Sequence, residues 1–296
     1  MVASMLAGYE CLQLAKSTHV ALPLALAYHC GQAFRWRQVH VCPDPHGPSY
    51  VEWSLCIHNR VVFLVHDVDE HCLYYRTVQA SGSMKSHDTG AWLWDYLNLR
   101  APTSTWYQEW CQRDPIFAKH AKRFAGVSIL RQDPWECMCA FICSSNNNIP
   151  RISQMVHKLC DHFTEPVLHH TYPPGSHLCT SMSPEKNGLQ IESTEPLHLT
   201  YHPFPTPSQL AAPGVEQKLR NLGFGYRAKY LTGTAQALCA LAKESLAADD
   251  TKHAHIDQAV NDYLLSLRTK SYSDAREALV QLPGIGPKVA EYVRPC

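Results

Sequence analysis

The chain has 296 residues, 45% of them hydrophobic and 18% charged, which is the composition of a globular protein with room for two domains. Lysine plus arginine balance aspartate plus glutamate at 26 each, so the bulk charge excludes a uniformly basic nucleic-acid binder and leaves only local patches for that role. The 13 cysteines form no CxxC pair, and the 18 histidines form no HExxH or paired Cys/His spacing. These patterns predict a reduced intracellular protein without a metal site or a cofactor.

The first 80 residues carry the strand patterns. The apolar stretch VALPLALAY, 20–28, is too short to span a membrane, and we expect it to form a strand or part of the core. Residues 33–41 and 50–79 are rich in β-branched and aromatic side chains, with a turn expected at Asn59–Arg60, and predict antiparallel strands. From about residue 88 the period becomes helical, and little strand signal follows.

Two helix starts are marked by their capping residues. In QDPWECMCAFICSS, Asp133 can cap, Pro134 suits the first helical position and Glu136 can complete a capping box. In NIPRISQMVHKLCDHF, Pro150 opens a second helix. The apolar side chains of this helix recur at helical spacing and predict a core-facing stripe, made of Ile152, Met155, Val156, Leu159, Cys160 and Phe163.

Several segments leave alternatives open. The loop SSNNNIPR between those helices is either a plain capping turn or a recognition loop held on rigid helices. Residues 170–196 are rich in Pro, Ser, Thr and Gly and predict a flexible insertion. Two basic runs are either solvated helix faces or local nucleic-acid-binding patches: Lys119, Lys122 and Arg123, and Lys218, Arg220, Arg227 and Lys229.

The end of the chain, SYSDAREALVQLPGIGPKVAEYV, predicts a helix, a tight Gly-x-Gly turn and a second helix. Such a turn exposes free backbone N–H groups at a helix start, where they can bind a phosphate without reading the base sequence. The alternative is a purely structural helix turn. Lys288 lies just inside the second helix and is a candidate nucleophile, because a neutral amine can form a Schiff base with a sugar carbon. The alternative role for this lysine is a charge beside the phosphate.

Four segments in this order carry a family resemblance: GQAFRWR (31–37), LRQDPWECMCAFICSSNNNIPRI (130–152), LGFGYRAKYL (222–231) and LPGIGPKVA (282–290). Together they resemble the 8-oxoguanine DNA glycosylase/AP lyase family, which belongs to the helix-hairpin-helix base-excision glycosylases. The similarity runs from about residue 20 to residue 293. It implies an α+β fold, with an N-terminal antiparallel β-sheet domain over 1–126 and an all-α domain over 127–296 that contains the 170–196 insertion.

The resemblance implies base flipping, in which the enzyme extrudes a damaged base from the duplex and fills the gap. By similarity, Asn146 enters the vacated space, and Arg151 and Arg227 hydrogen-bond the estranged cytosine. Tyr226 resembles the aromatic wedge on the opposite strand. Gly31 resembles the residue whose carbonyl accepts the N7–H that 8-oxoguanine has and guanine lacks.

The resemblance also assigns the hairpin. It implies that Gly284, Gly286 and Val289 contact the phosphate backbone through their main chains, and that Lys288 attacks C1′ to give a Schiff base and then β-elimination. The implied partner is double-stranded DNA containing 8-oxoguanine paired with cytosine, bound by a monomer without a membrane association. The implied location is the nucleus, with the mitochondrion as the alternative.

The sequence departs from the family pattern near its end. The family has a catalytic aspartate in a VDxH-like segment about twenty residues after the lysine, which is beyond Cys296, and Tyr292 stands where a pocket cysteine is usual. The tail RPC, 294–296, matches nothing in the family. From these departures we expect weak DNA binding, inefficient base excision and a last helix whose Val289, Ala290, Tyr292 and Val293 lack packing partners. The alternative function is a non-catalytic DNA-binding truncated isoform or a gene-model fragment of the same family.

Overall fold

The computed structural model describes residues 6–15, 18, 20–26, 30–44, 47–79, 88–179, 195–247 and 255–293. The chain forms two compact units. Unit 1 comprises Met1–Ile129 and Glu165–Pro203, and unit 2 comprises Leu130–Thr164 and Phe204–Cys296. Each is described by itself below.

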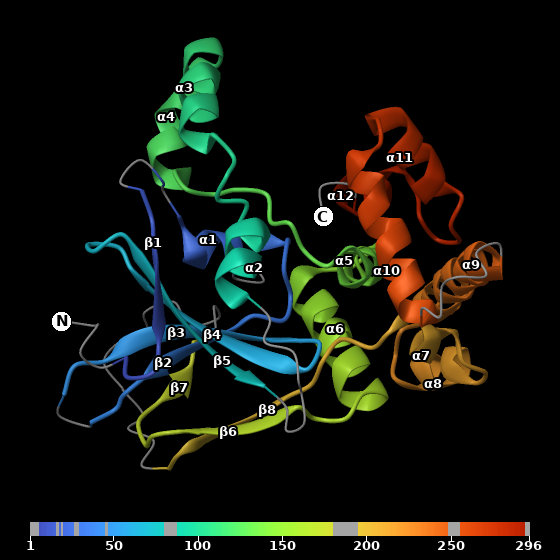
Figure 1. Ribbon diagram of the computed structural model, residues 1–296, viewed down its shortest axis with the longest axis horizontal. Coiled ribbons are helices and arrows are strands. Elements are labelled where there is room, and N and C mark those ends of the chain that lie inside the picture. The colour runs from blue at the N-terminus through green and yellow to red at the C-terminus, as the bar shows by residue number, and fades with distance from the viewer. Residues whose placement is uncertain are drawn as a thin grey trace. The chain divides into compact units, whose positions relative to one another are not determined.

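Unit 1 is built on antiparallel β-sheet (Figure 1). A six-stranded sheet has the order β1-β5-β4-β3-β2-β7, and β6 and β8 form a separate two-stranded sheet. The strands are β1 (Glu10–Gln13), β2 (Arg37–Val41), β3 (Tyr50–Ile57), β4 (Arg60–Asp67), β5 (Cys72–Gln79), β6 (Leu168–Tyr172), β7 (His177–Leu178) and β8 (Leu197–Tyr201). The strands predicted within 33–41 and 50–79 are therefore confirmed, although β2 begins only at Arg37. The turn expected at Asn59–Arg60 falls on His58 and Asn59, one residue earlier.

The core of unit 1 joins the two sheets. Phe63 of β4, fully buried, packs with Tyr172 of β6 and Tyr201 of β8 in one apolar cluster. Next to these tyrosines, Glu52 of β3 is 2% exposed, and its carboxylate accepts hydrogen bonds from the Tyr9 hydroxyl and from the Tyr172 hydroxyl at 2.7 Å. Burial raises the pKa of Glu52, and the two hydroxyl hydrogen bonds oppose that shift.

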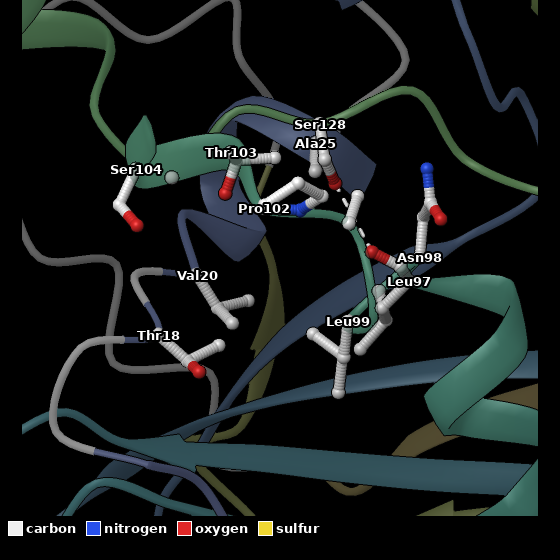
Figure 2. Close-up of a pocket in the computed structure, with 12 residues that line it drawn as sticks. Thr18, Val20, Ala25, Leu97, Asn98, Leu99, Pro102, Thr103, Ser104 and Ser128 are labelled. Carbon is white, nitrogen blue, oxygen red and sulfur yellow. Dashed lines mark hydrogen bonds between the residues drawn. The ribbon is translucent and has the colours of Figure 1, made fainter. Parts of the chain in front are cut away.

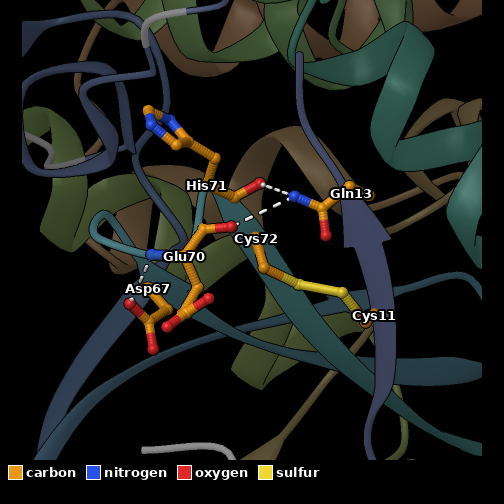
Figure 3. Close-up of a disulfide and its surroundings, with 6 residues drawn as sticks. All are labelled: Cys11, Gln13, Asp67, Glu70, His71 and Cys72. Carbon is orange, nitrogen blue, oxygen red and sulfur yellow. Dashed lines mark hydrogen bonds between the residues drawn. A yellow bond between two sulfur atoms is a disulfide. The ribbon is translucent and has the colours of Figure 1, made fainter. Parts of the chain in front are cut away.

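A disulfide joins Cys11 of β1 to Cys72 of β5, with their Cα atoms 6.3 Å apart (Figure 3). The two strands are neighbours in the sheet, and the Gln13 side chain on β1 donates to the carbonyls of Glu70 and His71, just before β5. The expectation of a fully reduced protein is wrong at this pair, because sheet pairing brings together two cysteines that lie 61 residues apart.

The described cysteines other than this pair form no disulfide bond: Cys30, Cys42, Cys56, Cys111, Cys137, Cys139, Cys143, Cys160, Cys179 and Cys239.

The insertion predicted at 170–196 is corrected at its N-terminal end. Residues 168–172 form β6, which pairs with β8, and His177 of β7 pairs with His40 of β2. Residues 180–194 lie outside the described part of the chain. These pairings place 165–203 in unit 1, whereas the sequence-based division at 126/127 put that segment in the second domain. The signal was missed because β6 and β8 have only five residues each, and alternation as in LHLTY is difficult to recognise over so short a stretch.

The helices of unit 1 are α1 (Leu22–Leu26), α2 (Thr89–Tyr96), α3 (Thr103–Arg113) and α4 (Pro115–Ala121), followed by a 3-10 turn, η3 (Lys122–Phe124). The stretch expected as strand or core is thus a short helix, and its Leu22 and Leu26 are fully buried. Asp88 caps α2 through the Ala91 amide.

Unit 2 consists of helices in its described residues. They are α5 (Pro134–Cys143), α6 (Ile149–Phe163), α7 (Pro207–Ala211), α8 (Val215–Asn221), α9 (Arg227–Ala247), α10 (Ile256–Ser266), η4 (Leu267–Thr269), α11 (Tyr272–Val280) and α12 (Pro287–Val293). Asp133 caps α5 by accepting from the Glu136 amide at 2.8 Å, and Pro134 occupies the predicted first position. An antiparallel sheet domain followed by a helical domain confirms the predicted α+β class.

The distribution of apolar residues bears on the predicted stripe of α6 and on membrane-spanning helices. The stripe on α6 is buried at Ile152, Met155, Val156, Leu159 and Cys160, whereas its last predicted member, Phe163, is only half-buried. Across the described ranges, the structure contains no helix that is both long and apolar enough to traverse a bilayer.

Candidate nucleic-acid interface

The hairpin between α11 and α12 packs tightly on α9 at its first glycine. Gly284 has φ +79°, in the left-handed region that favours glycine. A Cβ atom on Gly284 would lie 2.5 Å from Cβ and 2.7 Å from Cγ of Tyr230, so no side chain fits there without displacing α9. At Gly286 a Cβ atom would meet nothing within 4 Å. The first glycine therefore serves packing, while the second lies beside open space.

A second contact fixes the hairpin on the same helix. The Thr234 hydroxyl on α9 donates to the Pro283 carbonyl, and the Thr234 side chain is fully buried. A Cβ atom on Gly233 would lie 3.4 Å from Pro283, within ordinary van der Waals contact. Tyr230 and Thr234 were not singled out from the sequence. Tyr226, Tyr230 and Thr234 follow one another at intervals of four residues. This spacing places residues on one face of a helix and could have predicted that Tyr230 and Thr234 lie on the same face as Tyr226.

The last helix, α12, packs on α5. Val289, Ala290 and Val293 are each at most 4% exposed, and the Tyr292 ring stacks on Phe141 of α5 with centroids 4.1 Å apart and planes 8° apart. The expectation that these four side chains lack packing partners is therefore wrong, because α5 is apolar on almost every side and supplies the missing contacts. The tail at 294–296 lies outside the described residues.

Lys288 is the second residue of α12, and its side chain is exposed. The first turn of α12 contains no acidic residue. On the next turn, Glu291 forms an ion pair with Arg276 at 3.5 Å and accepts from the Tyr272 hydroxyl. The carboxylate nearest along the helix is thus engaged with α11, which leaves the exposed amine accessible from solvent.

The asparagine loop between α5 and α6 divides its residues between two roles. Asn148 caps α6 by accepting from the Arg151 amide at 3.0 Å, and the Asn147 side chain donates to the Cys143 carbonyl at 2.9 Å. Asn146 has φ +46°, an uncommon value for a residue with a side chain, and it is exposed. The capping interpretation thus holds for two asparagines, and Asn146 is the one held in a strained, outward position.

Side chains at and just before the start of α9 donate hydrogen bonds to the backbone carbonyls of this loop. Ser145 accepts from the Tyr226 hydroxyl at 2.9 Å and from Nε of Arg227 at 3.1 Å. The Asn146 carbonyl accepts from the Arg227 guanidinium at 3.0 Å. Arg227 is 4% exposed, so its donors are used inside the protein.

Arg151 and Tyr226 present exposed side chains beside this loop. Arg151 donates to the Gly223 carbonyl at 3.4 Å, and the Tyr226 ring is 47% exposed. The structure therefore brings Asn146, Arg151, Tyr226 and Arg227 together at the α5–α6 loop and the start of α9. Their predicted contacts with the bases stay predictions, and Arg227 would first have to exchange its hydrogen bonds with the loop.

Gly31, the predicted damaged-base contact, belongs to unit 1 and has φ +77°. Unit 1 also contains a cavity of about 190 Å³ (Figure 2). It is lined by Thr18, Val20, Ala25, Leu97, Asn98, Leu99, Ala101, Pro102, Thr103, Ser104, Gly126 and Ser128. The lining contains no titratable side chain and none of the predicted site residues, so this cavity is not the candidate site.

Two of the three thiols of α5 are held in the neutral form by burial. Burial raises the pKa of Cys143 to about 12, and burial likewise raises the pKa of Cys139. Within the part of the chain that the structure describes, no three His, Cys, Asp or Glu side chains are grouped so that they could hold a metal ion. The chemistry available at this surface is that of an amine, amides, guanidinium groups and an aromatic ring.

Two family models match consecutive stretches of the chain. The model for the 8-oxoguanine DNA glycosylase N-terminal domain matches residues 13–138, and the model for the HhH-GPD superfamily of base excision DNA repair proteins matches residues 139–283.

Similar proteins agree with these matches. The N-glycosylase/DNA lyase OGG1 of Arabidopsis thaliana is 34% identical over 275 residues, which cover 93% of this chain and 60% of the relative. The N-glycosylase/DNA lyase of Saccharomyces cerevisiae is 34% identical over 276 residues, which cover 92% of this chain and 62% of the relative. The chain therefore spans about three fifths of the length of these curated relatives.

Solved structures share the fold at lower identity. The Clostridium acetobutylicum 8-oxoguanine glycosylase/lyase in complex with double-stranded DNA containing cytosine opposite 8-oxoguanine has a TM-score of 0.62 at 20% identity, covering 97% of this chain and 75% of that chain. The structure of MBOgg1 in complex with a low-affinity DNA ligand has a TM-score of 0.61 at 22% identity, covering 96% and 78%. The two family models and the two curated relatives show that the chain belongs to the 8-oxoguanine DNA glycosylase family of helix-hairpin-helix base-excision repair proteins.

Proposed function

We propose that this chain carries the DNA N-glycosylase and AP lyase function of its family, removing 8-oxoguanine paired with cytosine from double-stranded DNA. The observation that carries the proposal is the exposed Lys288 amine, placed one residue after the start of α12 on a Gly-x-Gly hairpin that packs on α9. An amine at that point can reach a sugar whose phosphates the hairpin backbone holds.

In the proposed reaction, the Lys288 amine forms a bond to C1′ as the C1′–N9 bond breaks, and the base leaves with the bonding electron pair and takes up a proton. Loss of an amine proton and opening of the sugar ring give a Schiff base. Removal of a 2′ proton then expels the 3′ phosphate by β-elimination. Lysine serves as a nucleophile in such chemistry when its amine is neutral.

In this proposal, the α5–α6 loop and the start of α9 supply the residues that would fill the gap in the duplex and contact the unpaired cytosine. Asn146 is held outward by its positive φ and by the Arg227 hydrogen bond to its carbonyl, which suits it to fill the gap left by a flipped nucleotide. The exposed ring of Tyr226 suits a wedge that stacks on a base, and the Arg151 guanidinium suits the hydrogen-bonding edge of cytosine.

Three further assignments belong to the proposal. The Gly31 carbonyl would accept from N7–H of 8-oxoguanine, which guanine lacks. The backbones of Gly284, Gly286 and Val289 would contact phosphates. The protein would act as a monomer in the nucleus.

Borohydride trapping tests the proposal. The chain is mixed with duplexes that contain 8-oxoguanine opposite cytosine, an abasic site, or no lesion, and the Schiff base is reduced to a stable adduct. Trapping on both damaged duplexes, absent in Lys288→Gln, is the expected result. The matched control is Lys243→Gln, an exposed lysine on α9, which should trap as the unchanged chain does.

The other outcomes separate the rival functions. Trapping on the abasic duplex alone would leave a lyase and contradict base excision. Duplex binding without trapping on either damaged duplex would support the non-catalytic DNA-binding alternative and overturn the proposed chemistry.

A further inference from the structure

An exposed aromatic surface on unit 1 includes none of the residues used in the proposed reaction. We call residues 103–124, which form α3, α4 and η3, the aromatic–basic hairpin. None of the eleven residues of α3 is buried. Trp106 is 40% exposed, Trp110 is 45% exposed and Phe124 is 43% exposed. Large aromatic side chains at such exposure on one short segment are unusual for a protein surface without a ligand.

The rings form a connected cluster. Trp106 and Trp110 are four residues apart on α3, with centroids 6.4 Å apart and planes within 29° of parallel. Trp110 meets Phe117 of α4 edge to face at 5.7 Å, and Tyr107 contacts both of these rings. The Tyr107 hydroxyl donates to the Phe124 carbonyl at 2.6 Å, which ties η3 to α3. The exposed ring faces are therefore held in place from behind.

Within the hairpin, cationic side chains outnumber anionic ones. The basic side chains of the hairpin are Arg113, Lys119, Lys122 and Arg123, and its acidic side chains are Glu109 and Asp114. All six are exposed. One of the two acids is already engaged, because the Asp114 carboxylate caps α4 through the Ile116 and Phe117 amides. The surface thus combines base-sized aromatic faces with unbalanced positive charge.

We propose that the aromatic–basic hairpin is a second nucleic-acid contact that binds unpaired, single-stranded nucleotides. Bases stack on exposed aromatic rings whatever their sequence, and lysine and arginine neutralise the phosphates between them. A paired base buries its faces in the helix, so Trp106 and Trp110 fit unpaired nucleotides and not intact duplex. The contact is distinct from the Gly-x-Gly hairpin of unit 2 and does not depend on Lys288.

Charge and composition favour a nucleic acid over a membrane surface. A helix that lies in a bilayer interface presents a continuous apolar face. On α3 the segments beside the tryptophans are polar, as TSTWYQEWCQR shows, and no Leu, Ile or Val occurs in that helix. A small cluster of exposed aromatic rings flanked by polar side chains is suited to stacking on bases.

The test is the affinity of the full chain for a fluorescein-labelled oligothymidylate, measured by anisotropy over a series of salt concentrations. The charge variant Lys119→Glu/Lys122→Glu alters two exposed side chains. It should weaken binding by at least about tenfold and make the slope of log K against log salt shallower by about 1.4, for two phosphates on a single strand. The matched control Lys243→Glu/Lys270→Glu changes two exposed lysines of unit 2 and should leave the affinity within about twofold.

The aromatic variant Trp106→Ala should weaken binding by about 5- to 100-fold without changing the salt slope, because it removes stacking and no charge. If Trp106→Ala lowers the yield of folded protein, the charge variant still tests the proposal, because it changes only exposed side chains. Unchanged oligothymidylate affinity in the charge variant would overturn the proposal. So would binding to phosphatidylserine vesicles with the same variant sensitivity in place of binding to the oligonucleotide, or a dimer in sedimentation that Trp106→Ala dissociates.

The result can be read independently of base excision. Borohydride trapping of Lys288 and oligothymidylate binding are separate assays, so a chain that fails to trap still reports whether the aromatic–basic hairpin binds single strands. Where trapping occurs, the charge variant should trap on an abasic duplex as the unchanged chain does when the duplex is saturating.

Discussion

Two helices of similar length have opposite environments in this protein. In α5, nine of ten residues are buried, whereas in α3 none of eleven is. The buried helix holds α12, the helix that carries Lys288, in place through the Phe141–Tyr292 stack. The exposed helix contributes little to its unit's core and presents tryptophans to solvent. Helix α5 thus supports its unit from within, whereas α3 lies on the surface. Substitutions on α5 should therefore lower the free energy of unfolding more than substitutions on α3.

The largest loss of stability should come from removing the disulfide between strands β1 and β5 of unit 1. Cys11→Ser removes a cross-link that closes a loop of 61 residues, and the chain-entropy estimate gives a loss of about 4 kcal/mol under oxidising conditions. Six of the seven tryptophans lie in unit 1, so tryptophan fluorescence during urea unfolding reports mainly on that unit. Reductant should destabilise the unchanged chain and leave the variant as it was. Insensitivity of both to reductant would refute the role of the disulfide.

A core truncation on α5 should follow in size. Ile142→Ala removes a side chain that is 1% exposed and should cost about 3 kcal/mol, because the cavity cannot fully collapse. The matched change on α3, Gln108→Ala, alters an exposed residue and should stay within about 0.5 kcal/mol. Urea unfolding followed by circular dichroism measures both. Equal costs at the two sites would break the comparison.

The two glycines of the turn allow a sharper comparison at neighbouring positions. Gly284→Ala places a methyl group against Tyr230 at a positive φ and should cost about 2 kcal/mol or more, with weaker duplex binding. Gly286→Ala meets no atom within 4 Å and should leave stability within about 1 kcal/mol. Thermal unfolding and duplex-binding titrations distinguish them. If Gly286→Ala were the more destabilising of the two, the packing of the turn on α9 would be wrongly assigned.

The smallest effect concerns the buried carboxyl of unit 1. The pKa of Glu52 is raised in the folded state by burial, so the folded state holds its proton to higher pH than the unfolded state does. Stability contributed by Glu52 should therefore decline as the pH rises from the unfolded pKa through the raised folded pKa, and be flat above it. Glu52→Gln should lack this slope, with differences on the order of 1 kcal/mol. A slope of the opposite sign in the unchanged chain, relative to Glu52→Gln, would contradict the assignment.

Local signals predicted the helical unit better than the sheet unit. Asp133, Pro134 and the stripe on α6 predicted where helices begin and which face they bury, because capping and periodicity act within a few residues. The site residues of unit 2 followed from the Gly-x-Gly turn and the family resemblance.

Long-range pairing explains what could not be predicted. Strand β1, the Cys11–Cys72 disulfide and the return of 168–172 and 177–178 to unit 1 depend on partners far along the chain. The burial of Arg227 also depends on a neighbouring loop, since its guanidinium binds carbonyls of Ser145 and Asn146, about 80 residues away.

The most direct test of the central claim is to find which atom of this chain becomes bonded to DNA. After borohydride reduction on an abasic duplex and on an 8-oxoguanine duplex, nuclease and protease digestion followed by mass spectrometry locates the adduct. The proposed chemistry predicts a sugar-derived mass on the peptide that contains Lys288. An adduct on any other lysine or on the amino terminus, or no adduct on either duplex, would contradict it.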